Sequence, residues 1–236
     1  MAQLPPTTKI RTLSPLDPYN LAILSIWINY YLACTTPPGC IPHGYEGPSP
    51  KDGGGNSVKR YCRKCNAFKP PRTHHCSVCK TCVLRMDHHC PWLNNCVGFY
   101  NQGYFIRFIS SVGFAASYCL GLYSYKNFDR FYSPPPNSLT LVVMILDAVV
   151  LFILVLTVGL LALWQLYYAA SNTTTIEALE NEKIDKLIKR GIIRSATQYP
   201  YDLGSSLANL KSMLGRNMLL WWIPFRQEGN GIEFPM

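Results

Sequence analysis

Residues 62–96 read CRKCNAFKPPRTHHCSVCKTCVLRMDHHCPWLNNC. This stretch holds seven of the ten Cys and four of the five His in the 236-residue chain. Two Cys-x2-Cys knuckles, Cys62 with Cys65 and Cys76 with Cys79, lie among further Cys and His at short spacing, a pattern typical of zinc sites. Clustered Cys with interleaved His favour metal over disulfides, and therefore a reducing compartment. The stretch has no helical or strand period and little capacity for an apolar core, so we expect metal to hold it together.

The block offers more ligands than two zinc ions need. Seven Cys and four His are candidates, and two tetrahedral sites use eight of them. Three groups therefore stay free, and the spacing alone does not say which. The obvious split gives each knuckle one site, completed by two ligands from among His75, Cys82, His89 and Cys96 or their neighbours. Such closed sites leave no position for a catalytic water, so zinc would serve to fold the block.

Within the block, Asp87-His88-His89-Cys90 sets a carboxylate, two imidazoles and a thiol side by side. A thiol that zinc does not need, next to an imidazole with its own carboxylate, is a candidate nucleophile. An ordinary thiol is mostly protonated at neutral pH, because its pKa is about 8.5. The imidazole can take that proton while the carboxylate fixes the tautomer of the ring.

Three apolar segments flank the block. Residues 19–36 lie at the short limit for a membrane span, which needs about 20 residues, whereas residues 104–125 and 139–168 are long enough. Hydrophobic residues make up 48% of the chain and charged residues only 15%, which favours membrane spans over a soluble domain. We expect Arg107, near the start of the second segment, to snorkel to the lipid headgroups.

The distribution of Lys and Arg predicts the topology. Nine lie in residues 41–103, two in residues 126–138 and eight in residues 169–236. Because cytoplasmic loops are enriched in Lys and Arg, we expect residues 40–103 and the tail to be cytoplasmic and residues 126–138 to be a lumenal loop, after an N-terminal segment 1–18. The predicted fold class is an α-helical polytopic membrane protein with an irregular cytoplasmic zinc-binding Cys-rich domain between its spans. The net charge of +9 then suits an anionic membrane face.

The sequence around these residues resembles one family. Asp-His-His-Cys-Pro-Trp at residues 87–92, followed by Asn-Asn-Cys-Val-Gly at residues 94–98, is similar to the DHHC protein S-acyltransferases (palmitoyltransferases). The resemblance runs without a gap over residues 62–105. It returns at residues 174–177, Thr-Thr-Ile-Glu, which look like the family's TTxE motif, and at residues 201–215, which are similar to its C-terminal aromatic/Asn motif.

The resemblance implies two structural zinc sites with interleaved ligands, each of three Cys and one His. The first would use Cys62, Cys65, His75 and Cys82, and the second Cys76, Cys79, His89 and Cys96. Among the residues that remain, the family assigns Cys90 as the acylated nucleophile, His88 as the base and Asp87 as its orienting carboxylate.

The implied activity is transfer of a long-chain fatty acyl group, typically palmitoyl, from acyl-CoA through a Cys90 acyl-enzyme. The acceptors would be cysteine thiols of membrane-associated proteins at the cytoplasmic membrane face. Trp92 would flank the thioester, and Phe105 and Phe108 would line the acyl groove, with plain lipid contact as the alternative for the two Phe. Thr175 would bond the active-site carboxylate and tie the tail to the site.

Other roles follow from the resemblance with an ordinary surface role as the alternative. Asn209 would bond backbone near the span ends, or it is a plain polar residue of the tail. Lys64, Lys69 and Arg72 would meet CoA phosphates, or they face solvent or lipid headgroups. The small residues within 113–117 suggest a roomy groove.

Family members usually have four core spans, so we expect the first span of the family to be absent from this chain. That span helps to form the acyl cavity, and the alternative function is therefore a non-catalytic membrane zinc adaptor or an inactive truncated isoform. Pro37-Pro38-Gly39 and Trp221-Trp222-x-Pro224 look most like a fungal endoplasmic-reticulum subgroup, with the Golgi as the other location. Nucleic acid is not an expected partner, because no run of aromatic and basic residues suggests stacked bases.

Overall fold

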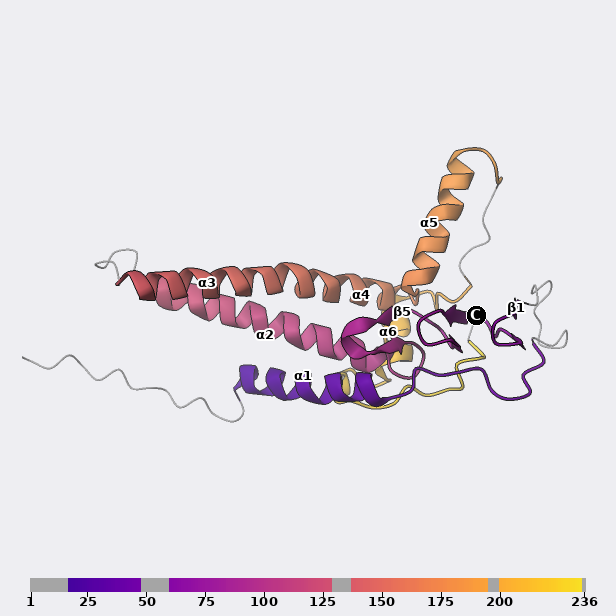
Figure 1. Ribbon diagram of the computed structural model, residues 1–236, viewed down its shortest axis with the longest axis horizontal. Helices are drawn as coiled ribbons and strands as arrows, with labels where there is room; N and C mark the ends of the chain where they lie inside the picture. Colours follow the sequence, from indigo (N-terminus) through magenta and orange to yellow (C-terminus); the bar gives the residue numbers. More distant parts are fainter. Residues whose placement is uncertain (1–16, 48–59, 129–136, 195–199, 235–236) are drawn as a thin grey trace, which may run out of the picture.

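The computed structural model describes residues 17–47, 60–128, 137–194 and 200–234 (Figure 1). The expected N-terminal segment lies almost wholly outside the described residues, and so does most of the expected lumenal loop. Long helices form one end of the molecule, and the Cys/His block with the tail forms the other.

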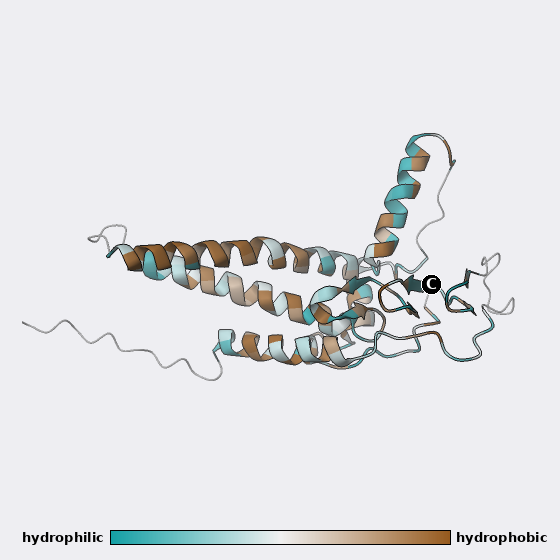
Figure 2. Cartoon of the chain, in the orientation of Figure 1, coloured by the Kyte–Doolittle hydropathy of each residue, from teal (hydrophilic) through white to brown (hydrophobic). Residues whose placement is uncertain are grey.

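The apolar segments of the sequence all form helices. These are α1 (Pro18–Thr35), α2 (Gln102–Phe128), and a continuous helix built from α3 (Ser138–Leu154), the π-helical η3 (Val155–Gly159) and α4 (Leu160–Ala170). α2 packs between α1 and the α3–α4 helix (Figure 1). Among the described residues, α2 and the helix Ser138–Ala170 are long and apolar enough to cross a membrane. In Figure 2 the ribbon of α3 is coloured as hydrophobic along most of its length. The 18-residue α1 is not among these helices.

The helices α2 and η3 approach closely at glycines. A Cβ atom added to Gly113 would lie 3.2 Å from the Cα of Gly159, so a larger side chain has no room there. Ala115 and Ala116 are buried as well. The expectation that small residues in this part of α2 open a roomy groove is therefore wrong at Gly113, since its lack of a side chain lets two helix backbones pack together.

The Cys/His block is built from three two-stranded antiparallel hairpins. Their strands are β1 (Tyr61–Cys62) with β2 (Ala67–Phe68), β3 (His74–Cys76) with β4 (Thr81–Val83), and β5 (His88–Cys90) with β6 (Asn95–Val97). Strands of two or three residues are too short to show an alternating pattern in sequence. Contrary to the expectation from its sequence, the block also has a small apolar core. Cys76, Val83, Met86 and Cys96 pack together, with Ile176 of the tail against them.

The tail contains α5 (Thr175–Lys189), α6 (Ser206–Leu214) and the short 3₁₀ helix η4 (Met218–Leu220). α5 points away from the body of the molecule at a steep angle to the long helices, and α6 lies beside the junction of the helices with the block (Figure 1). α5 begins with a capping box, in which the Thr174 hydroxyl accepts from the Glu177 N–H and the Glu177 carboxylate accepts from the Thr174 N–H.

Arg107 does not snorkel, which corrects the expectation from the sequence. Its side chain is buried, and the guanidinium donates to the carbonyls of Leu214 (3.2 Å) and Trp221 (2.5 Å). Leu214 ends α6, so its carbonyl lacks a partner within the helix and is free to accept from a cation. The Phe225 ring covers the guanidinium at 4.7 Å. Arg107 thus attaches the tail to the first turns of α2.

Candidate catalytic and zinc-binding site

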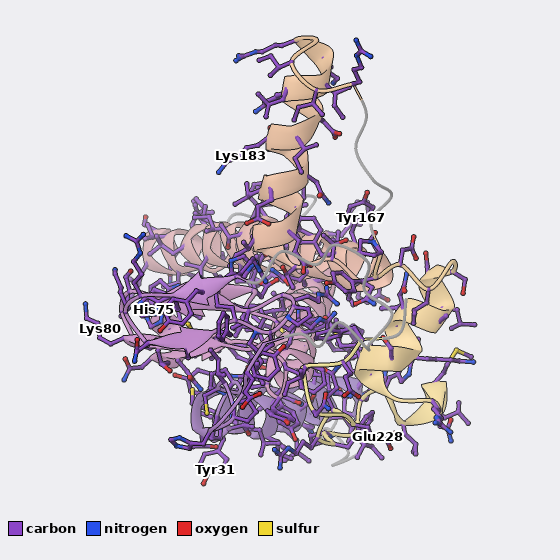
Figure 3. All side chains as sticks on the ribbon, turned by 90° about the vertical axis from the view of Figure 1, so that its right-hand side faces the viewer. Tyr31, His75, Lys80, Tyr167, Lys183 and Glu228 are labelled. Carbon is purple, nitrogen blue, oxygen red and sulfur yellow. The ribbon has the colours of Figure 1, made fainter. Side chains whose placement is uncertain are left out.

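The first expected zinc-ligand set lies together at the end of the molecule that faces the viewer in Figure 3, where His75 is labelled. The ligand atoms of Cys62, Cys65, His75 and Cys82 all lie within 4.8 Å of one another. The Nδ1 atom of His75 is 3.6, 3.2 and 3.8 Å from the three sulfurs in that order. Zinc bonds of about 2.3 Å to sulfur and about 2.0 Å to nitrogen at a tetrahedral angle imply S···N separations of about 3.5 Å, so these residues fit the ion.

The second expected set is equally compact. The ligand atoms of Cys76, Cys79, His89 and Cys96 lie within the same limit, and His89 Nδ1 is 3.7, 3.4 and 3.6 Å from the three sulfurs in that order. In each set the His faces its Cys across a hairpin: His75 opposite Cys82, and His89 opposite Cys96. Strand β3 contributes His75 to one set and Cys76 to the other, so the two sets interleave.

Strand β5 places the expected zinc ligand His89 on one face and the reactive groups of His88 and Cys90 on the other. Successive side chains of a strand point to opposite faces. His89 therefore points to the metal-ligand set, while His88 and Cys90 share the other face. The Nδ1 atom of His88 is 2.6 Å from Oδ2 of Asp87, which is fully buried. This contact engages Nδ1 and leaves the Nε2 side of the ring for Cys90, with which the His88 side chain also interacts.

Residues from outside the block hold the Asp87 carboxylate. Thr175 donates its backbone N–H to Oδ1 (2.8 Å) and its hydroxyl to Oδ2 (3.0 Å), and Gln165 of α4 donates to Oδ2 (3.3 Å). Burial raises the pKa of Asp87, but the hydrogen bonds from His88 and Thr175 outweigh that effect and lower it. Asp87 is therefore ionised at neutral pH and keeps a proton on Nδ1 of His88.

The pKa values of His88 and Cys90 shift in opposite directions. Burial lowers the pKa of His88, but its interactions with Asp87 and Cys90 prevail and raise the pKa to about 9. Burial raises the pKa of Cys90, but the interaction with His88 and the backbone N–H groups of Leu93 and Trp92 prevail and lower it. Together the two shifts favour a thiolate next to an imidazolium at neutral pH.

An apolar cluster adjoins the thiol. Cys90 packs in one buried cluster with Phe105, and Phe108 lies against the edge of that cluster. The Phe105 ring meets the His88 ring edge-on, with centroids 5.1 Å apart. Trp92 follows Cys90 closely in the chain, its side chain is 84% exposed, and its carbonyl accepts from the Tyr30 hydroxyl of α1 (3.2 Å). The expected groove residues thus lie around Cys90.

Arg72 is not available to phosphates or solvent, which corrects one expectation from the sequence. It is buried and forms an ion pair with Glu177 (2.7 Å), and it also donates to the carbonyl of Asn172 (2.6 Å). Its partners lie about a hundred positions away in the sequence, so no local pattern reveals them. Lys64 is exposed and Lys69 half-buried. Of the three basic residues, Arg72 therefore holds the tail against the block.

Two further polar residues make contacts near the site: Gln165 with Asp87, and Asn209 with the end of α4. Gln165 had no signal in the sequence beyond being a polar residue in an apolar helix, and such residues usually face the bundle interior. Asn209 donates to the carbonyl of Ala170 (2.8 Å), the last residue of α4, and accepts from the Leu203 N–H (3.0 Å). That contact lies near the end of the long helix, where the resemblance had suggested it.

Comparisons with known proteins bear on this arrangement. Residues 55–182 match the family described as DHHC palmitoyltransferase. The chain is 33% identical over 216 residues to palmitoyltransferase PFA4 of Yarrowia lipolytica, covering 89% of this chain and 61% of that protein. It is 39% identical over 228 residues to probable protein S-acyltransferase 16 of Arabidopsis thaliana, covering 91% and 77%. It is 37% identical over 252 residues to palmitoyltransferase PFA4 of Mycosarcoma maydis, covering 94% and 52%. The chain thus spans between about half and three quarters of these relatives.

Proposed function

This chain belongs to the DHHC palmitoyltransferase family, and we propose that it transfers a long-chain fatty acyl group from acyl-CoA to cysteine thiols of other proteins through an acyl-enzyme on Cys90. One observation carries the proposal. Cys90 stands outside both metal-ligand sets and next to His88, whose Nδ1 is held at 2.6 Å by the buried Asp87. This is the arrangement of a nucleophile, its base and the group that orients the base.

In the first half of the reaction, the Cys90 thiolate attacks the carbonyl carbon of the acyl-CoA thioester. A new C–S bond to Cys90 forms, the bond to the CoA sulfur breaks, and the leaving thiolate takes the proton held by His88. In the second half, a substrate Cys gives its proton to His88 and attacks the acyl-enzyme, which releases the Cys90 thiolate. Each half exchanges one thioester for another, so the sequence of steps needs no ATP.

Zinc, when bound to the two Cys₃His sets, supplies folding energy to hairpins too short to fold alone. Neither set leaves a position for a reactive water, so the proposed role of the metal is structural. The set that includes His89 lies on the same three-residue strand as Cys90. Zinc at that set would hold the strand in place and thereby fix the distance between the thiol and its base.

The proposed setting is the cytoplasmic face of a membrane. The family is membrane-bound, and the Lys and Arg of the block and tail support a cytoplasmic position for Cys90. α2 and the α3–α4 helix would cross the bilayer, with α1 beside them. The buried cluster around Phe105 and Phe108 would receive the start of the acyl chain. Acceptors would be membrane-associated proteins with cytoplasmic Cys. The endoplasmic reticulum is the proposed membrane, on the resemblance of Pro37-Pro38-Gly39 and Trp221-Trp222-x-Pro224 to one subgroup of the family.

The test is labelling of the purified chain with palmitoyl-CoA. We expect a hydroxylamine-sensitive thioester at Cys90 in the wild type and none in Cys90→Ser, with the same zinc content in both. Cys40→Ser, which removes an exposed thiol outside both ligand sets, is the matched control and should label normally. Bound zinc without any thioester in the wild type would favour the zinc-adaptor alternative. Zinc loss in Cys90→Ser with label retained would overturn the ligand assignment.

A further inference from the structure

A short apolar segment of the tail is left exposed by the fold. Residues 218–223 comprise η4 and the turn that follows it. The side chains of Leu219, Trp222 and Ile223 are 88%, 60% and 55% exposed, and Met218 and Leu220 are exposed as well. Soluble surfaces rarely present five large apolar side chains within six residues. Within the described part of the chain, each of these five side chains stays between 45% and 88% exposed.

The fold holds this segment at a defined level along α2. Arg107 donates to the carbonyl of Trp221 (2.5 Å), and the Trp221 indole N–H donates to the carbonyl of Gly215 (2.8 Å). Trp222 lines an apolar groove of about 450 Å³ together with residues of α1, such as Leu21, and of α2, such as Phe114. The exposed side chains therefore continue the apolar surface of α1 and α2, beside the first turns of α1 and the part of α2 around Ser111 and Phe114.

We propose that residues 218–223 form a membrane anchor that lies in the cytoplasmic interface of the bilayer. Trp is enriched at that depth because its ring is apolar and its N–H is polar. Arg216 and Arg226, both exposed, flank the segment and suit the anionic headgroups of a cytoplasmic leaflet. A stable protein partner usually covers about 20–30 residues a side, so a patch of six residues fits lipid better than a protein.

The anchor gives Arg107 a function beyond packing. The Arg107 guanidinium holds the backbone of the segment through the carbonyl of Trp221, so the apolar side chains are free to point outward into lipid. The tail is then attached to the rest of the protein through Arg72, Arg107 and Asn209, and to the membrane through the anchor. The proposal goes beyond acyl transfer, since it requires only that the chain resides in a membrane and stands even if Cys90 is never acylated.

The experiment uses the whole chain in phosphatidylcholine nanodiscs that contain a phosphatidylcholine with a photoactivatable diazirine close to its glycerol backbone. Trypsin cleaves after Arg216 and Arg226, so the anchor is recovered as one peptide, residues 217–226. We expect lipid cross-linked to this peptide in the wild type. The double variant Leu219→Gln with Trp222→Gln should lose most of that label and keep its zinc.

Val78→Gln is the matched control, since it removes a 65% exposed apolar side chain from the Cys/His block; its label on residues 217–226 should equal that of the wild type. An unlabelled anchor peptide beside labelled peptides of α3 would overturn the proposal. Cross-links from the anchor peptide to a second copy of the chain, in place of lipid, would overturn it too and assign the segment to an interface between copies.

Discussion

The buried ion pair between Arg72 and Glu177 gives the most specific stability prediction. The two side chains are 1% and 9% exposed, and their atoms approach to 2.7 Å. Glu177→Gln keeps the shape of the side chain but leaves the Arg72 charge buried without its countercharge. Removing one partner of a buried pair costs about 3–5 kcal/mol, because the charge that remains has lost both water and partner. Since about 1.4 kcal/mol is a factor of ten, the tail should undock roughly 10²–10⁴ times more often.

Hydrogen exchange measures this opening directly. Backbone amides in the first turns of α5 should lose protection by the factor above in Glu177→Gln, until the opening reaches the limit set by global unfolding. Glu182→Gln is the matched control: it removes a carboxylate of the same helix from a pair with Lys186 in which both side chains are about 60% exposed, and it should leave protection unchanged. The double variant Arg72→Met with Glu177→Gln should recover part of the loss, because it removes the unpaired charge.

Docking of the tail should also affect the reactivity of Cys90. When the tail undocks, Thr175 leaves Asp87, so alkylation of Cys90 should slow in Glu177→Gln and not in Glu182→Gln. Equal protection of α5 in Glu177→Gln and the wild type would refute the energetic argument. Lost protection with unchanged alkylation of Cys90 would refute the link between tail docking and the catalytic residues.

Two further predictions concern the thiol and the helix packing. The rate of Cys90 alkylation by iodoacetamide should reach its plateau at a lower pH than that of an ordinary thiol, because the pKa of Cys90 is lowered. The imidazolium of His88 should persist until the pH passes about 9, which is the pKa of His88. In His88→Ala the pKa of Cys90 should rise and the rate at neutral pH should fall, and an unchanged pH profile would contradict the pairing. Gly113→Ile should destabilise the folded protein by at least 1–3 kcal/mol, the usual cost of overpacking, because its Cβ would meet the backbone of Gly159 at 3.2 Å; denaturant unfolding in detergent checks this against Gly121→Ile, where a Cβ meets open space.

What the sequence could predict depended on how far apart the interacting residues lie. The two Cys-x2-Cys knuckles could be predicted from their spacing because a knuckle is a local structure, whereas the full ligand sets were implied only by the family resemblance. The burial of Arg72 and Arg107 could not be predicted from the sequence. A charged residue is assigned to water by default, yet these two bond partners 105 and 114 positions away, whose position only the folded tail determines. Strands of two or three residues carry too few side chains to reveal their alternation, so the hairpins were missed as well.

The four residues 174–177 show how one local pattern serves both stability and chemistry. Thr174 and Glu177 close the capping box that starts α5, and the same Glu177 pairs with Arg72. Thr175 is the first residue inside that helix, and the N–H of this position has no partner within a helix. Here it donates to Asp87 at 2.8 Å, so the carboxylate lies at the positive end of the α5 dipole. The spacing of the motif therefore follows from helix geometry: the cap, the free N–H and the ion pair must occupy fixed positions in one turn for the tail to keep Asp87 ionised and His88 oriented.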